Sequence, residues 1–293
     1  MPSSALLEQA TSEWQATPFI ENLEQVVRTV EVSMVTFKNS ISLIEKNLRE
    51  ILNGSHEGIS IAVNIFDNGV DRDLQLFCDR NNYNYHTVGR NIGFGAGHNY
   101  IYKIRQSTGK CFLLINPDVE FNGCNLKIIV DFLFSDNSIG IVSPRLLNDD
   151  GSLQKTCRYL PSPISLFLRK VTGGLFFSDE VCFADQTSIF SVPFIHGACF
   201  FIRSDVIEKI GLFDERYFLY CEDMDLCRRA LSFYKVINFG TVAAKHSHAR
   251  GSSKSLKLFV LHTRSALAYF KKWGFFVDKE RAALNKTQRI YLY

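Results

Sequence analysis

The chain has 293 residues, a formal net charge of +3, and 46% hydrophobic and 22% charged residues. This composition is that of an ordinary globular protein and excludes a disordered or collagen-like chain. The charge is uneven: from Lys245 onward, 11 Lys or Arg stand against only Asp278 and Glu280, a formal +9, whereas residues 1–244 carry −6. A basic tail on an acidic body indicates contact with an anionic membrane or nucleic acid; a solvated helix face is the alternative.

The N-terminal segment, the lengths of the apolar runs and the cysteines indicate the compartment and the kind of membrane contact. The N-terminus has no basic segment followed by an apolar one, so we expect no signal peptide. The chain contains no run of about 18 apolar residues, so we expect no membrane-spanning helix. The eight cysteines form no CxxC pair and several lie in apolar runs, which is typical of reduced, buried thiols in the cytosol. We therefore expect a cytoplasmic protein whose membrane contact is peripheral.

Short apolar strands alternate with helical patterns through the first half of the chain. Strands are predicted at residues 32–37, 59–66, 83–88, 111–115 and 139–143, with helices between them. This alternation predicts βαβ units and a mostly parallel, Rossmann-like sheet flanked by helices. In the less regular second half we predict one apolar strand over 194–203, a short helix over 205–210 and a further helix within 218–230.

Polar clusters follow four of these strands. They are Thr36–Asn39, Asp67–Asn68, Arg90–Asn99 and Asn116–Asp118. Because ligands of parallel sheets bind outside the carboxyl ends of the strands, four clusters on one edge indicate a binding site there.

The first-half clusters suit a phosphate-bearing ligand and a metal. The glycines after Gly89 follow the third strand with the wrong spacing for a dinucleotide fingerprint, but they permit close backbone approach to a phosphate or sugar. Asp118 suits Mg²⁺ or Mn²⁺ shared with a diphosphate. Asp67 could accept a hydrogen bond from a base or ribose. A tight turn is the alternative interpretation for all three segments.

The second half contributes an acidic cluster and a histidine pair. Glu222, Asp223 and Asp225 lie within one helical turn, where repulsion and burial would raise one pKa and create a general base. Acids that complement the helix dipole are the alternative. His246 and His248 lie on one side of an extended segment and could bind metal or phosphate, or have no role.

Apolar and aromatic residues recur at helical spacing after Ser255, with basic residues between them. Such a basic amphipathic helix fits an anionic membrane interface. A helix packed on the body, with a basic outer face, is the alternative. Nucleic-acid binding lacks a motif and interleaved aromatics, so we expect no nucleic-acid partner.

Six ordered segments together resemble bacterial inverting glycosyltransferases of family 2 with the GT-A fold, and in particular the O-antigen rhamnosyltransferases. They are residues 35–39, 67–68, 91–99, 114–119, 197–203 and, most specifically, 211–228. The resemblance covers about residues 31–275. It implies an N-terminal extension at 1–30, a catalytic domain at 31–250 with a nucleotide-sugar half (31–145) and an acceptor half (146–250), and a basic amphipathic region at 251–293.

The resemblance also implies residue roles. Asp223 would be the catalytic base, with Glu222 and Asp225 orienting the base or the acceptor. Donor-binding residues would be Thr36, Asp67, Asn91, Gly93, Asn99, Asn116, Arg250 and Ser253; Asp118 and His248 would hold the metal, with His246 the weaker candidate; Gly197 and Ala198 would lie on the acceptor side. Asn116 stands where the family motif has its first Asp, so only Asp118 is a firm metal ligand.

The implied activity is transfer of L-rhamnose from dTDP-L-rhamnose onto a polyprenyl-diphosphate-linked saccharide, with a divalent metal, Mg²⁺ or Mn²⁺. The place would be the cytoplasmic face of the inner membrane, in the synthesis of O-antigen, a part of lipopolysaccharide, or of another cell-surface polysaccharide. Two alternatives stay open: a UDP-sugar donor, such as galactofuranose or a hexose, and a non-catalytic nucleotide-sugar-binding subunit of a polysaccharide assembly complex.

Overall fold

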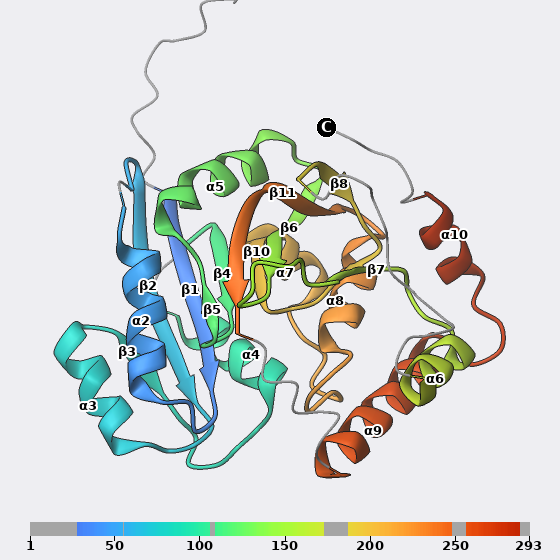
Figure 1. Ribbon diagram of the computed structural model, residues 1–293, viewed down its shortest axis with the longest axis horizontal. Helices are drawn as coiled ribbons and strands as arrows, with labels where there is room; N and C mark the ends of the chain where they lie inside the picture. Colours follow the sequence, from blue (N-terminus) through green and yellow to red (C-terminus); the bar gives the residue numbers. More distant parts are fainter. Residues whose placement is uncertain (1–27, 55, 106–108, 173–186, 248–255, 288–293) are drawn as a thin grey trace, which may run out of the picture.

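The computed structural model describes residues 28–54, 56–105, 109–172, 187–247 and 256–287 (Figure 1). His248, Arg250 and Ser253, which the resemblance assigned to the metal and the donor, lie outside these residues, as does the predicted extension up to residue 27.

A nine-stranded mixed sheet forms the centre of the protein (Figure 1). Its path is β3 (Asn84–His86), β2 (Ile59–Asp67), β1 (Arg28–Thr36), β4 (Cys111–Ile115), β10 (Cys199–Arg203), β6 (Ile139–Leu147), β11 (Lys235–His246) and β5 (Val119–Glu120), with β8 (Ile189–Ser191) beside β11. The helices are α2 (Ile41–Leu52), α3 (Arg72–Asn81), α4 (Phe94–Ile104), α5 (Leu126–Ser135), α6 (Pro163–Thr172), α7 (Ser204–Ile210), α8 (Glu222–Ala230), α9 (Leu256–Trp273) and α10 (Lys279–Thr287). This arrangement confirms the predicted α/β class with flanking helices.

The first four strands in the chain are parallel, as the alternation of strands and helices predicted. Alternate residues of β1 enter different cores: Val32 and Met34 pack on one face of the sheet and Val35 on the other. Burial on both faces explains why these strands are continuous apolar runs. The register sets Thr36 opposite Asp67, so both lie at the carboxyl edge of the sheet. Strand β1 begins at Arg28, four residues before the predicted start.

The prediction of one strand over 194–203 is wrong: the segment is broken into two strands, and the residues between them lie near α8. The segment forms β9 (Phe194–Ile195), which pairs with β7 (Cys157–Arg158), and then β10, which runs antiparallel between β4 and β6. His196, Gly197 and Ala198 lie between the two strands. The amide of Gly197 donates to a carboxylate of α8 at 3.0 Å. A side chain therefore replaces a neighbouring strand as the partner of this amide.

Buried ion pairs tie the C-terminal helices to α8. The Arg228 guanidinium donates to both carboxylate oxygens of Asp278, at 2.7 and 2.6 Å, and to Glu280 at 3.0 Å. The Arg228 and Asp278 side chains are only 1% and 3% exposed, whereas Glu280 is 49% exposed. The only two acids of the basic tail therefore point towards one buried arginine.

Replacing Asp278 with Ala should destabilise the protein strongly, because it leaves the Arg228 charge buried without its bidentate partner. We expect a loss of about 3–5 kcal/mol in the free energy of unfolding, measured by denaturant titration. The matched control is Glu280→Ala, an exposed member of the same cluster, which should cost about 0–1 kcal/mol. Equal losses for the two variants would contradict the dominant role of the buried pair.

Candidate active site

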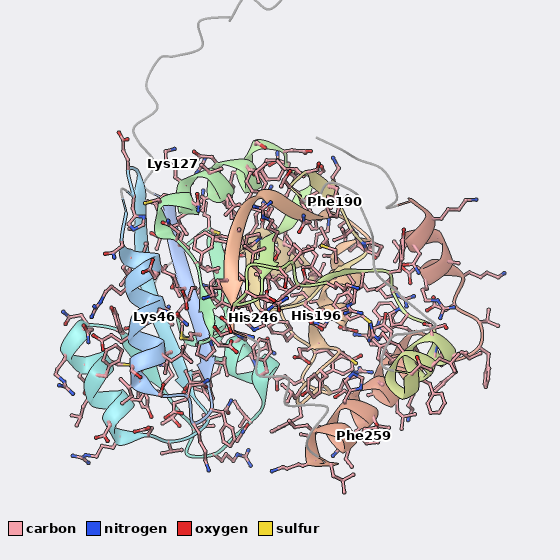
Figure 2. All side chains as sticks on the ribbon, in the orientation of Figure 1. Lys46, Lys127, Phe190, His196, His246 and Phe259 are labelled. Atoms are coloured by element: carbon pink, nitrogen blue, oxygen red, sulfur yellow. The ribbon has the colours of Figure 1, made fainter. Side chains whose placement is uncertain are left out.

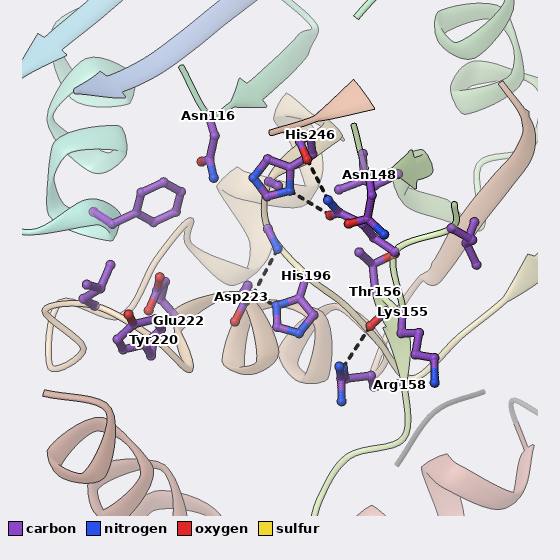
Figure 3. Close-up of a pocket in the computed structure, with 17 residues that line it drawn as sticks. Asn116, Asn148, Lys155, Thr156, Arg158, His196, Tyr220, Glu222, Asp223 and His246 are labelled. Atoms are coloured by element: carbon purple, nitrogen blue, oxygen red, sulfur yellow. Dashed lines mark hydrogen bonds and ion pairs between the residues drawn. The ribbon is translucent and has the colours of Figure 1, made fainter. Parts of the chain in front are cut away.

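A cavity of about 550 Å³ opens between the carboxyl edge of the sheet and the start of α8 (Figure 3). It is lined by Phe94, Asn116, Leu146, Asn148, Leu153, Gln154, Lys155, Thr156, Arg158, His196, Gly197, Ala198, Leu219, Tyr220, Glu222, Asp223 and His246. Segments far apart in the sequence thus converge, and among them are Asn116, Gly197, Ala198, Glu222 and Asp223, all expected from sequence.

Asp223 faces this cavity with 14% of its side chain exposed. Its Oδ2 accepts from the Gly197 amide at 3.0 Å and its Oδ1 from the Met224 amide at 2.8 Å. Burial raises the pKa of Asp223, and these two amide hydrogen bonds oppose the rise. A carboxylate whose proton affinity is raised and whose position is fixed by backbone suits a general base.

The backbone before Asp223 is strained. Tyr220 and Cys221 have φ values of 72° and 69°, in the left-handed region that non-glycine residues seldom adopt. Two such residues cost of order 1–3 kcal/mol each, and strain of this kind clusters at functional sites. This double turn leads directly into Glu222 and Asp223 at the first turn of α8.

Glu222 is buried beside Asp223, with 5% of its surface exposed. Its Oε2 has no hydrogen-bond partner among the described residues. Burial raises the pKa of Glu222 well above its usual value, and the Asp223 charge raises it further. Glu222 therefore favours the protonated form, so the pair can hold one acid and one base.

The structure places Asp225 outside the cavity, so it has no direct contact there with an acceptor, and its expected role in orienting the base stays a prediction. Asp225 is fully buried and is absent from the cavity lining. Arg229 donates to it at 2.8 Å, Lys272 at 3.0 Å and the indole of Trp273 at 2.8 Å. Its side chain points towards α9 because residues on one helix turn face different directions. Asp225 is a structural anchor between α8 and α9.

The metal candidates form a pair, Asp118 and His246. The Oδ1 of Asp118 lies 3.4 Å from Nε2 of His246. Gln154 fixes that imidazole: its Nε2 donates to the His246 carbonyl at 2.7 Å, which leaves its Oε1, 2.9 Å from Nδ1, to accept the Nδ1 proton. In the neutral tautomer, the unprotonated Nε2 then faces a carboxylate oxygen.

Two acceptor atoms at this distance can share a proton or a cation. Nearby, the buried Oδ1 of Asn116 makes no hydrogen bond to any described residue. This donor set, a carboxylate, an imidazole and an amide oxygen, fits Mg²⁺ or Mn²⁺. No cluster of three His, Cys, Asp or Glu occurs within the described ranges, so further ligands would have to come from elsewhere, such as a bound diphosphate. The sequence favoured His248 over His246; of these two, His246 is the one the structure describes, and it faces Asp118.

Thr36 and Asp67 meet on adjacent strand ends, where the Thr36 hydroxyl donates to Asp67 at 3.4 Å. The Asp67 carboxylate also accepts from the amides of Gly69 and Asp71, at 2.6 and 2.5 Å, and from the Tyr85 hydroxyl at 2.9 Å. These contacts match the turn that was the alternative interpretation of Asp67. A donor contact by Thr36 and Asp67 stays a prediction.

Asn91, Gly93 and Asn99 connect α4 to the segment before α8. The Asn91 side chain accepts from the Gly93 amide at 2.9 Å. Gly93 has a φ of 97°, and a Cβ there would lie 2.4 Å from the Phe218 carbonyl, so only glycine fits. Asn99 exchanges hydrogen bonds with the backbone of Phe213, at 2.8 and 2.9 Å. The close approach inferred from the glycines is thus to the protein's own chain, and donor binding by these residues stays a prediction.

The sequence patterns did not identify several polar residues of the cavity, among them Gln154, Lys155, Arg158 and His196. The first three lie on and before the two-residue strand β7, which has no periodic pattern. His196 lies inside an apolar run, and its polarity there was the available signal for a break in the strand.

Curated proteins related in sequence are glycosyltransferases. The chain is 27% identical over 203 residues to the low-salt glycan biosynthesis hexosyltransferase Agl10 of Haloferax volcanii, a match that covers 69% of this chain and 61% of that protein. It is 27% identical over 153 residues to an N-acetylglucosaminyl-diphospho-decaprenol L-rhamnosyltransferase of Mycobacterium tuberculosis, covering 47% of this chain and 50% of the relative. The chain thus spans only part of these relatives. No family model matches it.

Solved structures with a similar fold are also glycosyltransferases. GalNAc-T7 with UDP, GalNAc and Mn²⁺ aligns with a TM-score of 0.59 and 14% identity, covering 80% of this chain and 47% of that one. The mannosyltransferase PcManGT of Pyrobaculum calidifontis, in complex with GDP-Man and Mn²⁺, aligns with a TM-score of 0.51 and 16% identity. This alignment covers 97% of this chain and 86% of that one. These neighbours show that the chain has the GT-A glycosyltransferase fold. Together with the curated relatives they confirm the resemblance to rhamnosyltransferases and other GT-A enzymes.

Replacing Glu222 with Gln should stabilise the protein above about pH 5. Because the folded state raises the Glu222 pKa, its contribution to stability is present below the ordinary value of 4.5 and is lost as the pH rises through the folded pKa. Removing this titratable group should add about 1–3 kcal/mol to the free energy of unfolding at pH 8 relative to pH 4.5, measured as a rise in Tm, because the side chain can no longer ionise on unfolding.

The control for this prediction is Glu57→Gln, at an exposed glutamate far from α8. It should leave the pH dependence of Tm unchanged. The prediction would be contradicted if Glu222→Gln and the wild type had the same Tm at every pH. Burial of the Glu222 carboxyl would then contribute nothing to the pH dependence of stability.

Proposed function

We propose that the protein is a glycosyltransferase that moves a sugar from a nucleotide-sugar donor to an acceptor hydroxyl with inversion at the anomeric carbon. One observation carries this proposal. Asp223, a carboxylate with raised proton affinity held by two backbone amides, lines the same cavity as His246 and Asn116, which lie beside Asp118. A base and a candidate diphosphate site therefore share one cavity on the GT-A fold.

In this mechanism Asp223 takes the proton from the acceptor hydroxyl as the oxygen attacks the anomeric carbon. The bond from that carbon to the nucleoside diphosphate breaks, and its electron pair leaves with the phosphate. Asp118, His246 and the Asn116 amide oxygen would hold a divalent cation. Such a cation supplies neutralisation of charge on a departing diphosphate. Glu222, kept protonated by burial, can donate a hydrogen bond in the cavity without adding charge beside the base.

For the donor we propose dTDP-L-rhamnose, and for the acceptor a polyprenyl-diphosphate-linked saccharide of cell-surface polysaccharide synthesis such as O-antigen. The mycobacterial relative, a rhamnosyltransferase acting on an N-acetylglucosaminyl-diphospho-decaprenol, supports both. Lys155 and Arg158 line the cavity and supply positive charge suited to an acceptor diphosphate. The working place would be the cytoplasmic face of the inner membrane.

Replacing Asp223 with Asn should lower transfer by about 10²–10⁴-fold, because the general base is lost while the shape of the side chain is kept. The assay would supply dTDP-L-rhamnose, or UDP-galactofuranose and UDP-hexoses in parallel, with a short-chain prenyl-diphospho-N-acetylglucosamine and Mn²⁺. Released nucleoside diphosphate and glycosylated product would both be measured.

The control for this assay is Asp131→Asn, an exposed aspartate on α5, which should keep wild-type turnover. Near wild-type turnover of Asp223→Asn would contradict the assignment of the base. A wild-type protein that turns over none of the donors would favour the non-catalytic alternative. Faster transfer from a UDP-sugar would overturn the choice of rhamnose donor.

We also propose that α9 and the residues after it contact an anionic membrane. Within the described part of the chain, no helix has the length and apolarity to span a bilayer. The exposed side of α9 carries Leu256, Val260 and Leu267, and the basic residues of this helix include Lys257 and Arg264, which are also exposed. Residues spaced by three, four or seven positions share one helix face, so apolar and basic side chains form one stripe.

Neighbouring segments support the same orientation. Phe276 and Val277, just after α9, are 98% and 73% exposed, which is unusual for side chains this apolar. Figure 2 shows Phe259, which is 46% exposed, on the same helix. Asp278 and Glu280 point towards Arg228, so the acids of this region lie away from the stripe.

The protein should bind vesicles that contain about 30% anionic lipid at low salt and should be released at high salt, because each basic residue near such a surface contributes about 1 kcal/mol. Lys257→Glu combined with Arg264→Glu should weaken this binding at least about tenfold in a co-sedimentation assay. The matched control, Arg80→Glu with Lys127→Glu, reverses two charges on α3 and α5 and should leave binding unchanged. If the wild-type protein did not bind anionic vesicles, the membrane contact would be contradicted and α9 would have only a structural role.

A further inference from the structure

His196 faces the proposed base from the break between β9 and β10 (Figure 3). Its Nδ1 lies 3.6 Å from Oδ2 of Asp223, and its side chain is 47% exposed, against 14% for Asp223. The imidazole packs against Phe194 with ring centroids 5.2 Å apart. It therefore connects a largely buried carboxylate to solvent at the mouth of the cavity.

The backbone holds both partners of this pair. Because Gly197 follows His196 directly and donates its amide to Asp223, the hydrogen bond that fixes the carboxylate also fixes the histidine beside it. A Cβ at position 197 would come within 3.0 Å of the Asp223 Cβ, so the absence of a side chain allows this approach. The amide of His196 itself donates to the Thr156 carbonyl at 3.2 Å.

Other charged groups surround the pair from each neighbouring element. Glu222 and Asp223 come from α8, Arg158 comes from β7, Lys155 precedes β7, and His246 at the end of β11 lines the same cavity. The closest described approach of a carboxylate to the imidazole is that of Asp223, at 3.6 Å.

We propose that His196 receives the proton that Asp223 takes from the acceptor and passes it to solvent, so that the working base is an Asp223–His196 pair. This inference rests on the proposed transferase activity. In the first step the acceptor O–H bond breaks, an O–H bond forms on Asp223, and the acceptor oxygen bonds to the anomeric carbon. In the second step the proton leaves Asp223 for the unprotonated Nδ1 of His196, whose other nitrogen, Nε2, carries the ring proton. The resulting imidazolium gives one proton to water and, by proton exchange with solvent, returns to the Nε2–H tautomer, so both groups regain their starting state.

The direction of this transfer follows from ordinary proton affinities. An unperturbed imidazole, which titrates near pH 6.5, is a stronger base than an unperturbed aspartate near 3.9. Burial raises the pKa of Asp223 and so narrows this difference, but the half-exposed imidazole can pass the proton on to water. The product of the second step is a carboxylate beside an imidazolium, in which each charge stabilises the other. Since His196 acts through Asp223, it is a positioning and relay residue, and its test needs a readout that a purely structural role would not move.

The first test compares His196→Asn with the wild type in the transfer assay over pH 5–9. Asparagine keeps a hydrogen-bond donor near the position of Nδ1 but cannot take up the proton. We expect kcat to fall about tenfold or more. The acidic limb of the kcat/KM profile should move to lower pH by roughly one unit, because the carboxylate alone then titrates in place of the pair. His56→Asn, on the connection between α2 and β2, is the control and should match the wild type.

The second test needs no substrate. In the protein labelled with ¹⁵N-histidine, the His196 resonance, assigned by its loss in His196→Asn, should titrate at higher pH in the wild type than in Asp223→Asn, because the carboxylate stabilises the imidazolium. A His196 titration that is unchanged in Asp223→Asn would overturn the proposal.

The outcomes separate this inference from the proposed function. An active wild type whose His196→Asn variant keeps the same kcat and the same acidic limb would overturn the relay and leave the transferase assignment in place. A wild type that transfers no sugar would overturn the proposed function, and the relay with it, because no proton would be released.

Discussion

The buried carboxylate of Asp225 is the interaction on which the site depends most. It accepts hydrogen bonds or ion pairs from Arg229, Lys272, Trp273 and Tyr217, so that α8, α9 and the segment before α8 converge on one group. Arg229 extends this network through hydrogen bonds to three successive carbonyls at the end of α7. Because α8 also carries Asp223, the same anchor that joins α9 to α8 helps to set the position of the proposed base.

The site divides its carboxylates by environment. Asp223 is held by amides beside a half-exposed histidine, Glu222 is buried without a partner among the described residues, and Asp225 is neutralised by cations. Three acids in one helical turn thereby acquire three different tasks. The residues Tyr220 and Cys221, in the left-handed conformation, set the direction in which the helix begins, and they are two consecutive strained residues of the described chain.

The buried ion pairs also account for the basic surface of the C-terminal region. The acids of the basic tail are held by Arg228, and this buried pairing leaves lysines and arginines on the exposed side of α9. The proposed membrane contact and the proposed base are therefore connected through two neighbouring residues of α8, Asp225 and Arg228. A lipid-linked acceptor would arrive at the surface to which this helix is fixed.

The sequence by itself determined the α/β class and the polar edge of the sheet, and it offered Asp118 and Asp223 as candidates, because apolar periodicity and strand-end polarity are local patterns. The GT-A fold followed from resemblance. The tertiary structure alone decided that Asp225 points to α9, that His246 faces Asp118, and that His196 breaks a predicted strand to meet Asp223. The physical reason is that a side chain's direction and its partner depend on the packing of distant segments, which spacing along the chain does not encode.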